Sequence, residues 1–227
     1  MATSETNALA SMVTTLEEDV ILGVLHPRER LVEEELMTRF GAKRHVVREA
    51  LAKLDQMGLV ERRKNIGALV RSFTEQEVGE LYQLRSLLES EAARLIPFPV
   101  PPSQLKSLIA VQRTHDEAVV SGDLRRLFRI NQIFHQSLFA MARNATLLQA
   151  IEEYARKTHS IRFMSLMSPE YVERARRDHW AIIEALKGAD RKALIALCRT
   201  HHMPALEAFR RTSRLRERDG PRSQIAG

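Results

Sequence analysis

The stretch RHVVREALAKLDQMGLVERRKNIGALVR, residues 44–71, has the pattern of one amphipathic helix followed by a small β-hairpin. Its apolar residues recur at the spacing of one helical face over residues 44–57: Val47, Leu51 and Leu54. Gly58 stands where the C-cap of this helix is expected. Two short strands, residues 59–63 and 68–71, flank a polar turn, which predicts the hairpin.

Two more helices are predicted on the N-terminal side, over residues 12–25 and 32–40, and Gly41 interrupts before the next one. Three helices followed by a hairpin make a winged helix-turn-helix, which we assign to residues 10–72. The hairpin is the only β-structure that the pattern predicts. Residues 1–11 lack a positive segment and a hydrophobic core, so we expect a short mobile arm and no signal peptide.

On the C-terminal side the pattern is helical throughout and predicts a second domain at residues 75–214. Six helices are expected, over residues 75–96, 103–120, 123–142, 145–166, 169–187 and 190–214. Thr74 is the expected N-cap of the first helix, and the proline-rich segment 97–102 ends it. The fold class is therefore mostly α, an N-terminal winged helix-turn-helix followed by an all-α six-helix bundle. We expect the polar tail after residue 214 to be disordered.

The formal net charge of +6 is unevenly distributed along the chain. Residues 1–38 hold two basic and eight acidic side chains, whereas residues 39–71 hold nine basic and three acidic ones. This basic segment favours a polyanionic partner, double-stranded DNA. An aromatic content of 5% is too low for a single-strand stacking platform. A single cysteine, Cys198, and no apolar run of about 20 residues predict a cytoplasmic protein without membrane contact.

The start of the helix at residues 44–57 carries the side chains expected to read bases. A recognition helix inserts its N-terminal residues into the major groove, and Arg44 and Arg48 share one face there. Six further DNA contacts are expected beside them or in the hairpin: Lys43, His45, Arg62, Arg63, Lys64 and Gly67. The basic side chains of the hairpin are suited to contacts with DNA phosphates, and Gly67 lets the backbone approach a groove. A basic helix alone also fits a solvated surface, but the hairpin beside it favours DNA.

Three histidines on three separate predicted helices face the core of the bundle: His135, His179 and His201. Asn131 lies one turn before His135 on the same face. Neutral imidazoles with one carboxamide oxygen suit a divalent ion of the Zn, Ni or Mn type. The alternative for each histidine is a structural role, as a hydrogen-bonded residue of the core. Arg85 and Arg162 are candidates to bind a small carboxylate effector, against the alternatives of an Arg85–Glu89 ion pair and a surface position for Arg162.

The first domain resembles the GntR family of bacterial transcription regulators over residues 10–72. The matching segments are residues 21–27, 30–33, 44–51, 58–60 and 67–70. The family usually has Ser-Arg-Thr-Pro-Val-Arg at the position of residues 43–48, where this chain keeps only Arg44 and the Val-Arg that ends in Arg48. Ile66 stands where the wing often has Arg. The resemblance implies a homodimer on a roughly palindromic operator, but it does not carry over an operator sequence.

From about residue 75 to residue 211 the chain resembles the FCD effector domain of the FadR subfamily, in its VanR-like six-helix branch. The matching segments are residues 122–124, 131–135, 144, 147–148, 178–179, 182 and 199–201. The resemblance implies dimerisation, a pocket for a small organic acid, and a metal site made of one Asp and three His. Asn131 stands where the Asp usually is, so the affinity for a divalent cation is expected to be weaker.

Three other functions stay open on the sequence alone. A metal-free acyl-CoA-type sensor is the runner-up among regulators, although the three inward histidines and the six predicted bundle helices favour the metal version. A metal-dependent enzyme needs a general base beside the metal, and Asp178 points away from His179 around its helix. A nonspecific architectural DNA binder leaves the large helical domain unexplained.

Overall fold

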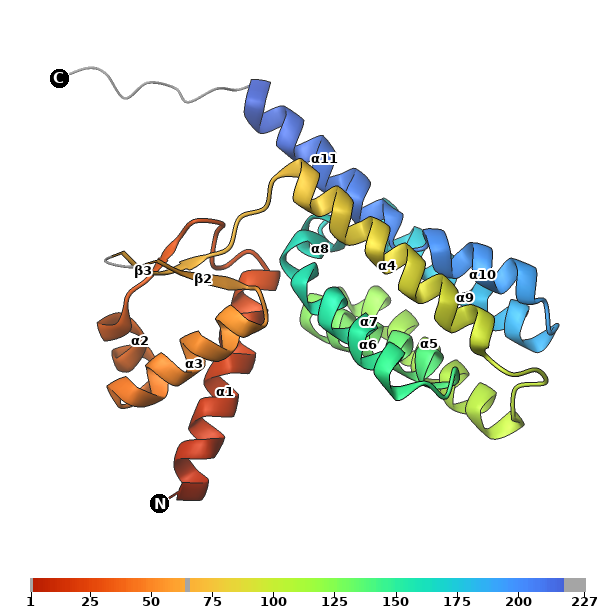
Figure 1. The fold of residues 1–227 in the computed structure, drawn as a ribbon, viewed down its shortest axis with the longest axis horizontal. Coiled ribbons are helices and arrows are strands. Elements are labelled where there is room, and N and C mark those ends of the chain that lie inside the picture. The colour runs from red at the N-terminus through yellow and green to blue at the C-terminus, as the bar shows by residue number, and fades with distance from the viewer. Residues whose placement is uncertain (1, 64–65, 219–227) are drawn as a thin grey trace.

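The computed structural model describes residues 2–63 and 66–218 and has two parts (Figure 1). The first part consists of α1 (Ala2–Ile21), β1 (Arg30–Leu31), α2 (Glu33–Phe40), α3 (Arg44–Gln56), β2 (Val60–Arg63) and β3 (Gly67–Val70). The second part consists of α4 (Glu75–Leu95), α5 (Pro102–Ser121), α6 (Leu124–Ala140), α7 (Ala145–Lys157), α8 (His159–Leu166), α9 (Pro169–Lys187), α10 (Arg191–Thr200) and α11 (Met203–Arg218). This confirms the predicted fold class.

The winged part is built around the helix that the sequence pattern identified. Val47, Leu51 and Leu54 of α3 are buried in one apolar cluster with residues of α1 and the sheet. Gly58 follows α3 with a φ of +74°, a left-handed conformation that ends the helix without a side-chain penalty. The predicted helix and its C-terminal glycine are therefore confirmed.

The sheet has three antiparallel strands in the order β1-β3-β2, where the sequence predicted only a hairpin. In that hairpin Val60 pairs with Val70 and Arg63 with Gly67. The additional strand is β1, in which Arg30 pairs with Leu69. It has two residues, too few to show an alternating pattern, so the sequence could not reveal it.

The expectation of a mobile N-terminal arm was wrong, because α1 begins at Ala2. Leu9 is buried in the same apolar cluster as Met12 and Leu16. The apolar face that the sequence showed after residue 12 therefore continues one turn further toward the N-terminus. Packing of Leu9 holds that extra turn against the winged part.

The bundle begins as predicted. The Thr74 hydroxyl accepts a hydrogen bond from the Glu77 backbone N–H, and the Glu77 carboxylate accepts one from the Thr74 N–H, which makes a capping box at α4. Residues 96–101 separate α4 from α5, and Pro102 is the first residue of α5. The apolar core lies between these helices and α6, α7, α9 and α10.

Two of the six predicted bundle helices are interrupted, so the part of the chain described after residue 74 holds eight helical segments. The first break is at Thr158, whose buried hydroxyl donates to the Ala155 carbonyl and accepts from Arg85. The second is at His201 and His202, between α10 and α11. Pro204 cannot donate to the carbonyl four residues earlier, which explains why the helix stops there.

The two parts are joined by packing of α1 against α8 as well as by the chain itself. None of the helices that the structure describes has the length and apolar character needed to cross a membrane.

Candidate functional site

The recognition helix α3 presents its N-terminal residues on the surface of the winged part. Lys43, Arg44, His45 and Arg48 are all exposed. Arg44 bonds Glu34 at 2.8 Å, and Arg48 bonds both oxygens of Glu33 at 3.0 Å. Both predicted base-reading arginines are thus held by carboxylates of α2.

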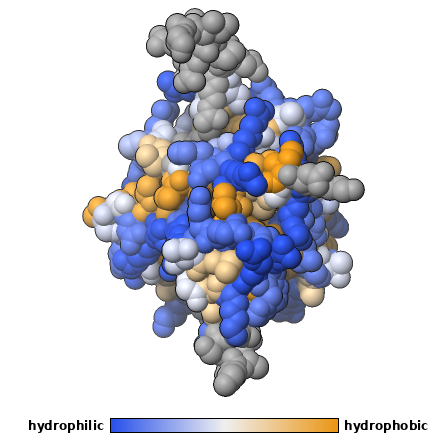
Figure 2. Space-filling view, turned by 90° about the vertical axis from the view of Figure 1, so that its left-hand side faces the viewer, coloured by the Kyte–Doolittle hydropathy of each residue, from blue (hydrophilic) through white to orange (hydrophobic). Residues whose placement is uncertain are grey.

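A groove of about 490 Å³ brings α3 and the wing together. It is lined by Arg48 of α3, by Arg62 and Arg63 of β2, and by Gly67 of β3. Gly67 has a φ of +102°, which L side chains rarely adopt. Lys64 lies outside the described residues. The view from the side of the winged part shows hydrophilic residues over most of this face, with smaller hydrophobic spots among them (Figure 2).

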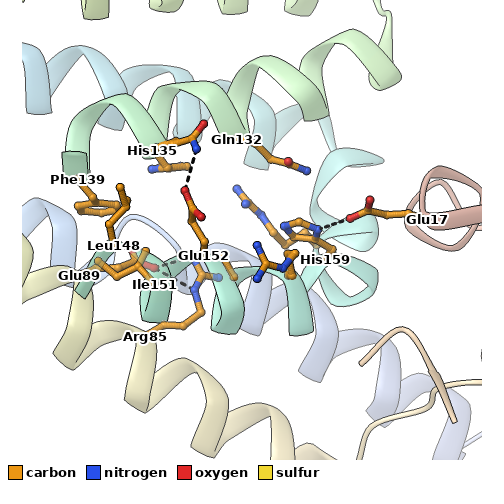
Figure 3. Close-up of a pocket in the computed structure, with 14 residues that line it drawn as sticks. Glu17, Arg85, Glu89, Gln132, His135, Phe139, Leu148, Ile151, Glu152 and His159 are labelled. Carbon is orange, nitrogen blue, oxygen red and sulfur yellow. Dashed lines mark hydrogen bonds and ion pairs between the residues drawn. The ribbon is translucent and has the colours of Figure 1, made fainter. Parts of the chain in front are cut away.

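A second cavity, of about 230 Å³, lies in the bundle (Figure 3). Its walls come from α4, α6, α7 and α8, and include the predicted residues Arg85, His135 and Arg162. Glu17 of α1 also lines it and points toward His159. The cavity therefore contains side chains of both parts of the molecule, a feature that the sequence did not reveal.

Arg85 and Glu89 form a buried ion pair, as the structural alternative predicted. Nε and Nη2 of Arg85 donate to Oε1 of Glu89 at 2.9 and 2.7 Å, and Nη1 donates to Thr158 at 3.0 Å. Burial alone would raise the pKa of Glu89, but the adjacent guanidinium of Arg85 opposes burial, and the pKa is lowered. Glu89 is thus a carboxylate whose other oxygen, Oε2, has no hydrogen-bond partner in the described structure.

Arg162 lies in the cavity wall and is half-buried, in contrast to the surface alternative. Burial lowers its pKa to about 10, and the nearby Arg85 acts in the same direction. The carboxamide oxygen of Asn131 accepts hydrogen bonds from Nη1 and Nη2 of Arg162 at 3.2 and 2.6 Å, in the amide orientation that satisfies both side chains. That oxygen is the atom that the sequence assigned to a metal ion. In the structure this oxygen is the hydrogen-bond acceptor of Arg162.

The three predicted histidines come together from α6, α9 and the end of α10. The ring centroid of His135 lies 5.1 Å from that of His179 and 4.7 Å from that of His201. Nδ1 of His179 bonds the Gln112 side-chain oxygen at 2.8 Å, and Nδ1 of His201 bonds the Cys198 carbonyl at 3.0 Å. Because those oxygens only accept, both imidazoles carry their hydrogen on Nδ1 and keep a lone pair on Nε2. Metal-binding histidines are usually oriented in this way.

Burial lowers the pKa of all three histidines, to about 3 for His201 and well below the usual value for His135 and His179. They are therefore neutral at pH 7. Neither ring nitrogen of His135 has a hydrogen-bond partner in the described structure, although both are buried. Unpartnered buried nitrogens of this kind fit a ligand or an ion.

A tighter group, which the sequence analysis missed, stands beside them. Among the described residues, ligand atoms of Glu89, His201 and His202 lie within 4.8 Å of one another. Glu89 Oε2 is 3.5 Å from Nε2 of His201 and 3.3 Å from Nδ1 of His202. The adjacent histidines at 201 and 202 were visible in the sequence, but the helix break that turns both rings inward was not.

The junction between the two parts is acidic on α1 and basic on the bundle. Nδ1 of His159 donates to Glu17 at 3.2 Å. Glu18, which is buried, accepts hydrogen bonds from Arg125 and Arg129 of α6. Part of the acidic excess of residues 1–38 is thus used to hold the bundle.

Comparisons with known proteins agree with the two-domain fold. The family described as bacterial regulatory proteins, gntR family, matches residues 10–70, and the FCD domain matches residues 80–203. The uncharacterized HTH-type transcriptional regulator YdhC of Bacillus subtilis is 27% identical over 78% of this chain and 80% of its own. The probable D-xylose utilization operon transcriptional repressor of Paenarthrobacter nicotinovorans is 29% identical over 76% and 75%. A putative GntR regulator structure from Rhodococcus sp. RHA1 has the same fold, with a TM-score of 0.75 at 19% identity, over 88% of this chain and 96% of its own.

Proposed function

The chain belongs to the GntR family of bacterial transcriptional regulators with an FCD effector domain, and from that premise we propose that it binds a palindromic operator as a homodimer. A small carboxylic acid that enters the bundle cavity then raises or lowers the affinity for the operator. Residues 10–72 are the proposed DNA-binding domain and residues 75–214 the proposed effector and dimerisation domain. The matched families and relatives are regulators, so the enzyme alternative is excluded.

The observation that carries this proposal is the composition of the cavity. Two guanidinium groups, those of Arg85 and Arg162, line the cavity together with Glu17 of the DNA-binding part. One acceptor at Arg162 is the neutral carboxamide of Asn131, and a carboxylate is a stronger acceptor for the same two N–H groups. A volume of about 230 Å³ suits a small acid better than an acyl-CoA, because pockets for larger ligands begin at roughly 300 Å³.

A divalent ion of the Zn, Ni or Mn type is the proposed cofactor, held by buried histidines at the cavity. His135 and His201 fit such an ion, because each keeps a buried ring nitrogen without a hydrogen-bond partner in the described structure, and Nε2 of His179 carries a lone pair. Asn131 fits less well, since its oxygen serves Arg162. A bound cation supplies positive charge that attracts a carboxylate effector.

The DNA contact is proposed to follow the geometry of other winged helix-turn-helix proteins. Arg44 and Arg48 read base edges in the major groove, while Lys43, His45, Arg62, Arg63 and Lys64 contact phosphates and Gly67 allows a close approach. Two copies related by a two-fold axis place two recognition helices on successive half-sites.

The effector response is proposed to pass through Glu17. An acid in the cavity lies next to this carboxylate and changes how favourably α1 packs on α8. Ligand binding then favours one arrangement of the two domains over another, which is the requirement for an allosteric response.

The test begins with selection of bound duplexes from a random library, which yields the operator consensus. A two-fold symmetric consensus is expected. A thermal-shift screen of small carboxylic acids follows, with the matching amides as controls, because ligand binding to the native state raises Tm. An acid that binds is then added to a gel-shift titration. Equal affinity for the consensus and random duplex at fixed salt, or no acid that alters operator affinity, would contradict the proposal.

A further inference from the structure

Three lone-pair atoms lie within 4.8 Å of one another in the interior of the bundle. They are Oε2 of Glu89, Nε2 of His201 and Nδ1 of His202, and none has a hydrogen-bond partner in the described structure. All three side chains are buried, with 1%, 7% and 4% of their residue surface exposed. We propose that Glu89, His201 and His202 form a divalent-cation site in this chain.

The hydrogen bonds around the group fix which nitrogen each histidine presents. His201 donates from Nδ1 to the Cys198 carbonyl, so its bare nitrogen is Nε2. The Ser86 hydroxyl lies 3.2 Å from the Arg199 carbonyl, to which it donates, and 3.0 Å from Nε2 of His202. Ser86 therefore accepts from Nε2 of His202, and the bare nitrogen of His202 is Nδ1. Two nitrogen lone pairs thus face one carboxylate oxygen, and a cation between them removes the repulsion.

The separations of the two nitrogens from Oε2 of Glu89 match those in a metal site. Zinc binds nitrogen and oxygen ligands at about 2.1 Å in a tetrahedron, which separates neighbouring ligand atoms by about 3.4 Å. The measured distances from Glu89 Oε2 are 3.5 Å to His201 and 3.3 Å to His202. The other oxygen, Oε1, is held by Arg85, so the carboxylate is already oriented. Three protein ligands leave one position for water or an effector oxygen.

This site explains how the chain manages without an acidic residue at position 131. Asn131 is uncharged and its oxygen accepts hydrogen bonds from Arg162, whereas Glu89 on α4 supplies a buried carboxylate. Glu89 also lines the effector cavity, so a cation bound to it lies at the cavity wall. The inference refines the metal part of the proposed function and rests on it. His201 belongs to both ligand sets, so it does not distinguish them.

Zinc titration of chelator-treated full-length protein distinguishes the two sets. Affinity and stoichiometry are measured by calorimetry and elemental analysis. We expect His202→Gln and Glu89→Gln each to weaken Zn²⁺ binding by at least about tenfold. His135→Gln and His179→Gln are expected to weaken binding less than either of these substitutions does, and the buried control His115→Gln is expected to bind as the wild type does. Circular dichroism in chelator establishes that each variant is folded.

A measurement on the unsubstituted chain makes the test independent of folding defects. Histidine-ring ¹⁵N resonances report which nitrogen binds the ion, and Zn²⁺ is expected to shift Nδ1 of His202 and Nε2 of His201. If Zn²⁺ binds but leaves the His202 ring unchanged, and His135→Gln or His179→Gln abolishes binding, the cation lies in the set predicted from the sequence and this inference is overturned. If the wild type binds no divalent ion, the metal part of the proposed function fails as well, while the DNA and effector parts are tested separately.

Discussion

His159 and Glu17 lie 142 residues apart in the sequence, yet Nδ1 of His159 donates to Oε1 of Glu17 at 3.2 Å (Figure 3). One residue belongs to α8 in the bundle and the other to α1 in the winged part. Both line the bundle cavity. A molecule that fills this cavity therefore meets the two domains at the contact that joins them.

Removal of this contact is expected to uncouple ligand binding from DNA binding. In Glu17→Ala, His159 loses its acceptor, and α1 no longer senses the cavity through a polar side chain. The ratio of operator dissociation constants with and without effector should fall toward one, while effector affinity changes little. Gel-shift titration measures the ratio. Glu170→Ala, an exposed acid on α9, is the control, and an unchanged ratio in Glu17→Ala would show that the coupling runs elsewhere.

The stability of the protein should fall on acidification because of His159. Burial lowers the pKa of His159 to about 4, against the opposing effect of Glu17, from an ordinary value of 6.5. The unfolded chain therefore takes up the proton first, so the stability present above pH 6.5 is lost as the pH falls toward 4. The full difference corresponds to roughly 3 kcal/mol.

Urea unfolding at pH 7, 6, 5 and 4.5 checks this prediction by comparison with His159→Gln, which does not titrate. The free energy of unfolding should decrease more steeply with acidification in the wild type than in the variant. The opposite slope would mean that His159 is charged in the folded state and gains from Glu17 as an ion pair.

The recognition helix gives a third prediction. Arg44→Ala and Arg48→Ala should each cost about 1–3 kcal/mol of discrimination between the operator and a mismatched duplex, because arginine binds guanine edges bidentately. Lys53→Ala, in the last turn of α3, is the control, since it lies away from the groove-entering end. Competition gel shifts at fixed salt provide the measurement. Unchanged specificity in both arginine variants would remove these residues from base recognition.

The carboxylates of α2 should restrain DNA binding. Glu33 and Glu34 form hydrogen bonds with Arg48 and Arg44, and those bonds have to break before the arginines reach bases. Exposed pairs contribute at most about 1 kcal/mol, so Glu33→Gln and Glu34→Gln should each raise operator affinity by a few-fold. Glu35→Gln removes an equal charge from the same helix and controls for general repulsion of phosphates. An equal gain in all three variants would assign the effect to charge alone.

The sequence predicted those elements whose causes are local. The apolar spacing in α3, the capping box at Thr74 and the prolines after α4 each act within a few residues, and each is where the sequence placed it. The two-residue strand β1 was not predicted, because it forms only through pairing with β3. The helix break at Thr158 was not predicted for a similar reason, since its hydroxyl accepts a hydrogen bond from Arg85 on a helix that is distant in the sequence.

The candidate site was predictable in residue type but not in pairing. The inward face of α6 identified Asn131 and His135 correctly as interior residues, because helical spacing decides which side is buried. That Asn131 would bond Arg162, and that Glu89 would face His202, depends on how separate helices cross. Periodicity within one helix carries no information about that crossing.

The buried pair of Arg85 and Glu89 gives the last prediction. Both side chains are almost fully buried, with 3% and 1% of their side-chain surface exposed, so Arg85→Met leaves a carboxylate that neither water nor arginine compensates. The loss of stability should be about 3–5 kcal/mol. Arg94→Met is the matched control on the same helix, because its pair with Glu91 is exposed and should change stability little. Urea unfolding in the presence of a chelator measures both without a metal contribution.

The double variant Arg85→Met/Glu89→Gln separates the ion pair from simple packing. Removal of the second partner takes away the stranded charge, so part of the stability lost in Arg85→Met should return. If the double variant is instead less stable than Arg85→Met by the full cost of a second core substitution, the arginine acts mainly through its packing and its bond to Thr158. The buried charge of Glu89 would then be compensated by His201 and His202, which lie 3.5 and 3.3 Å from its free oxygen.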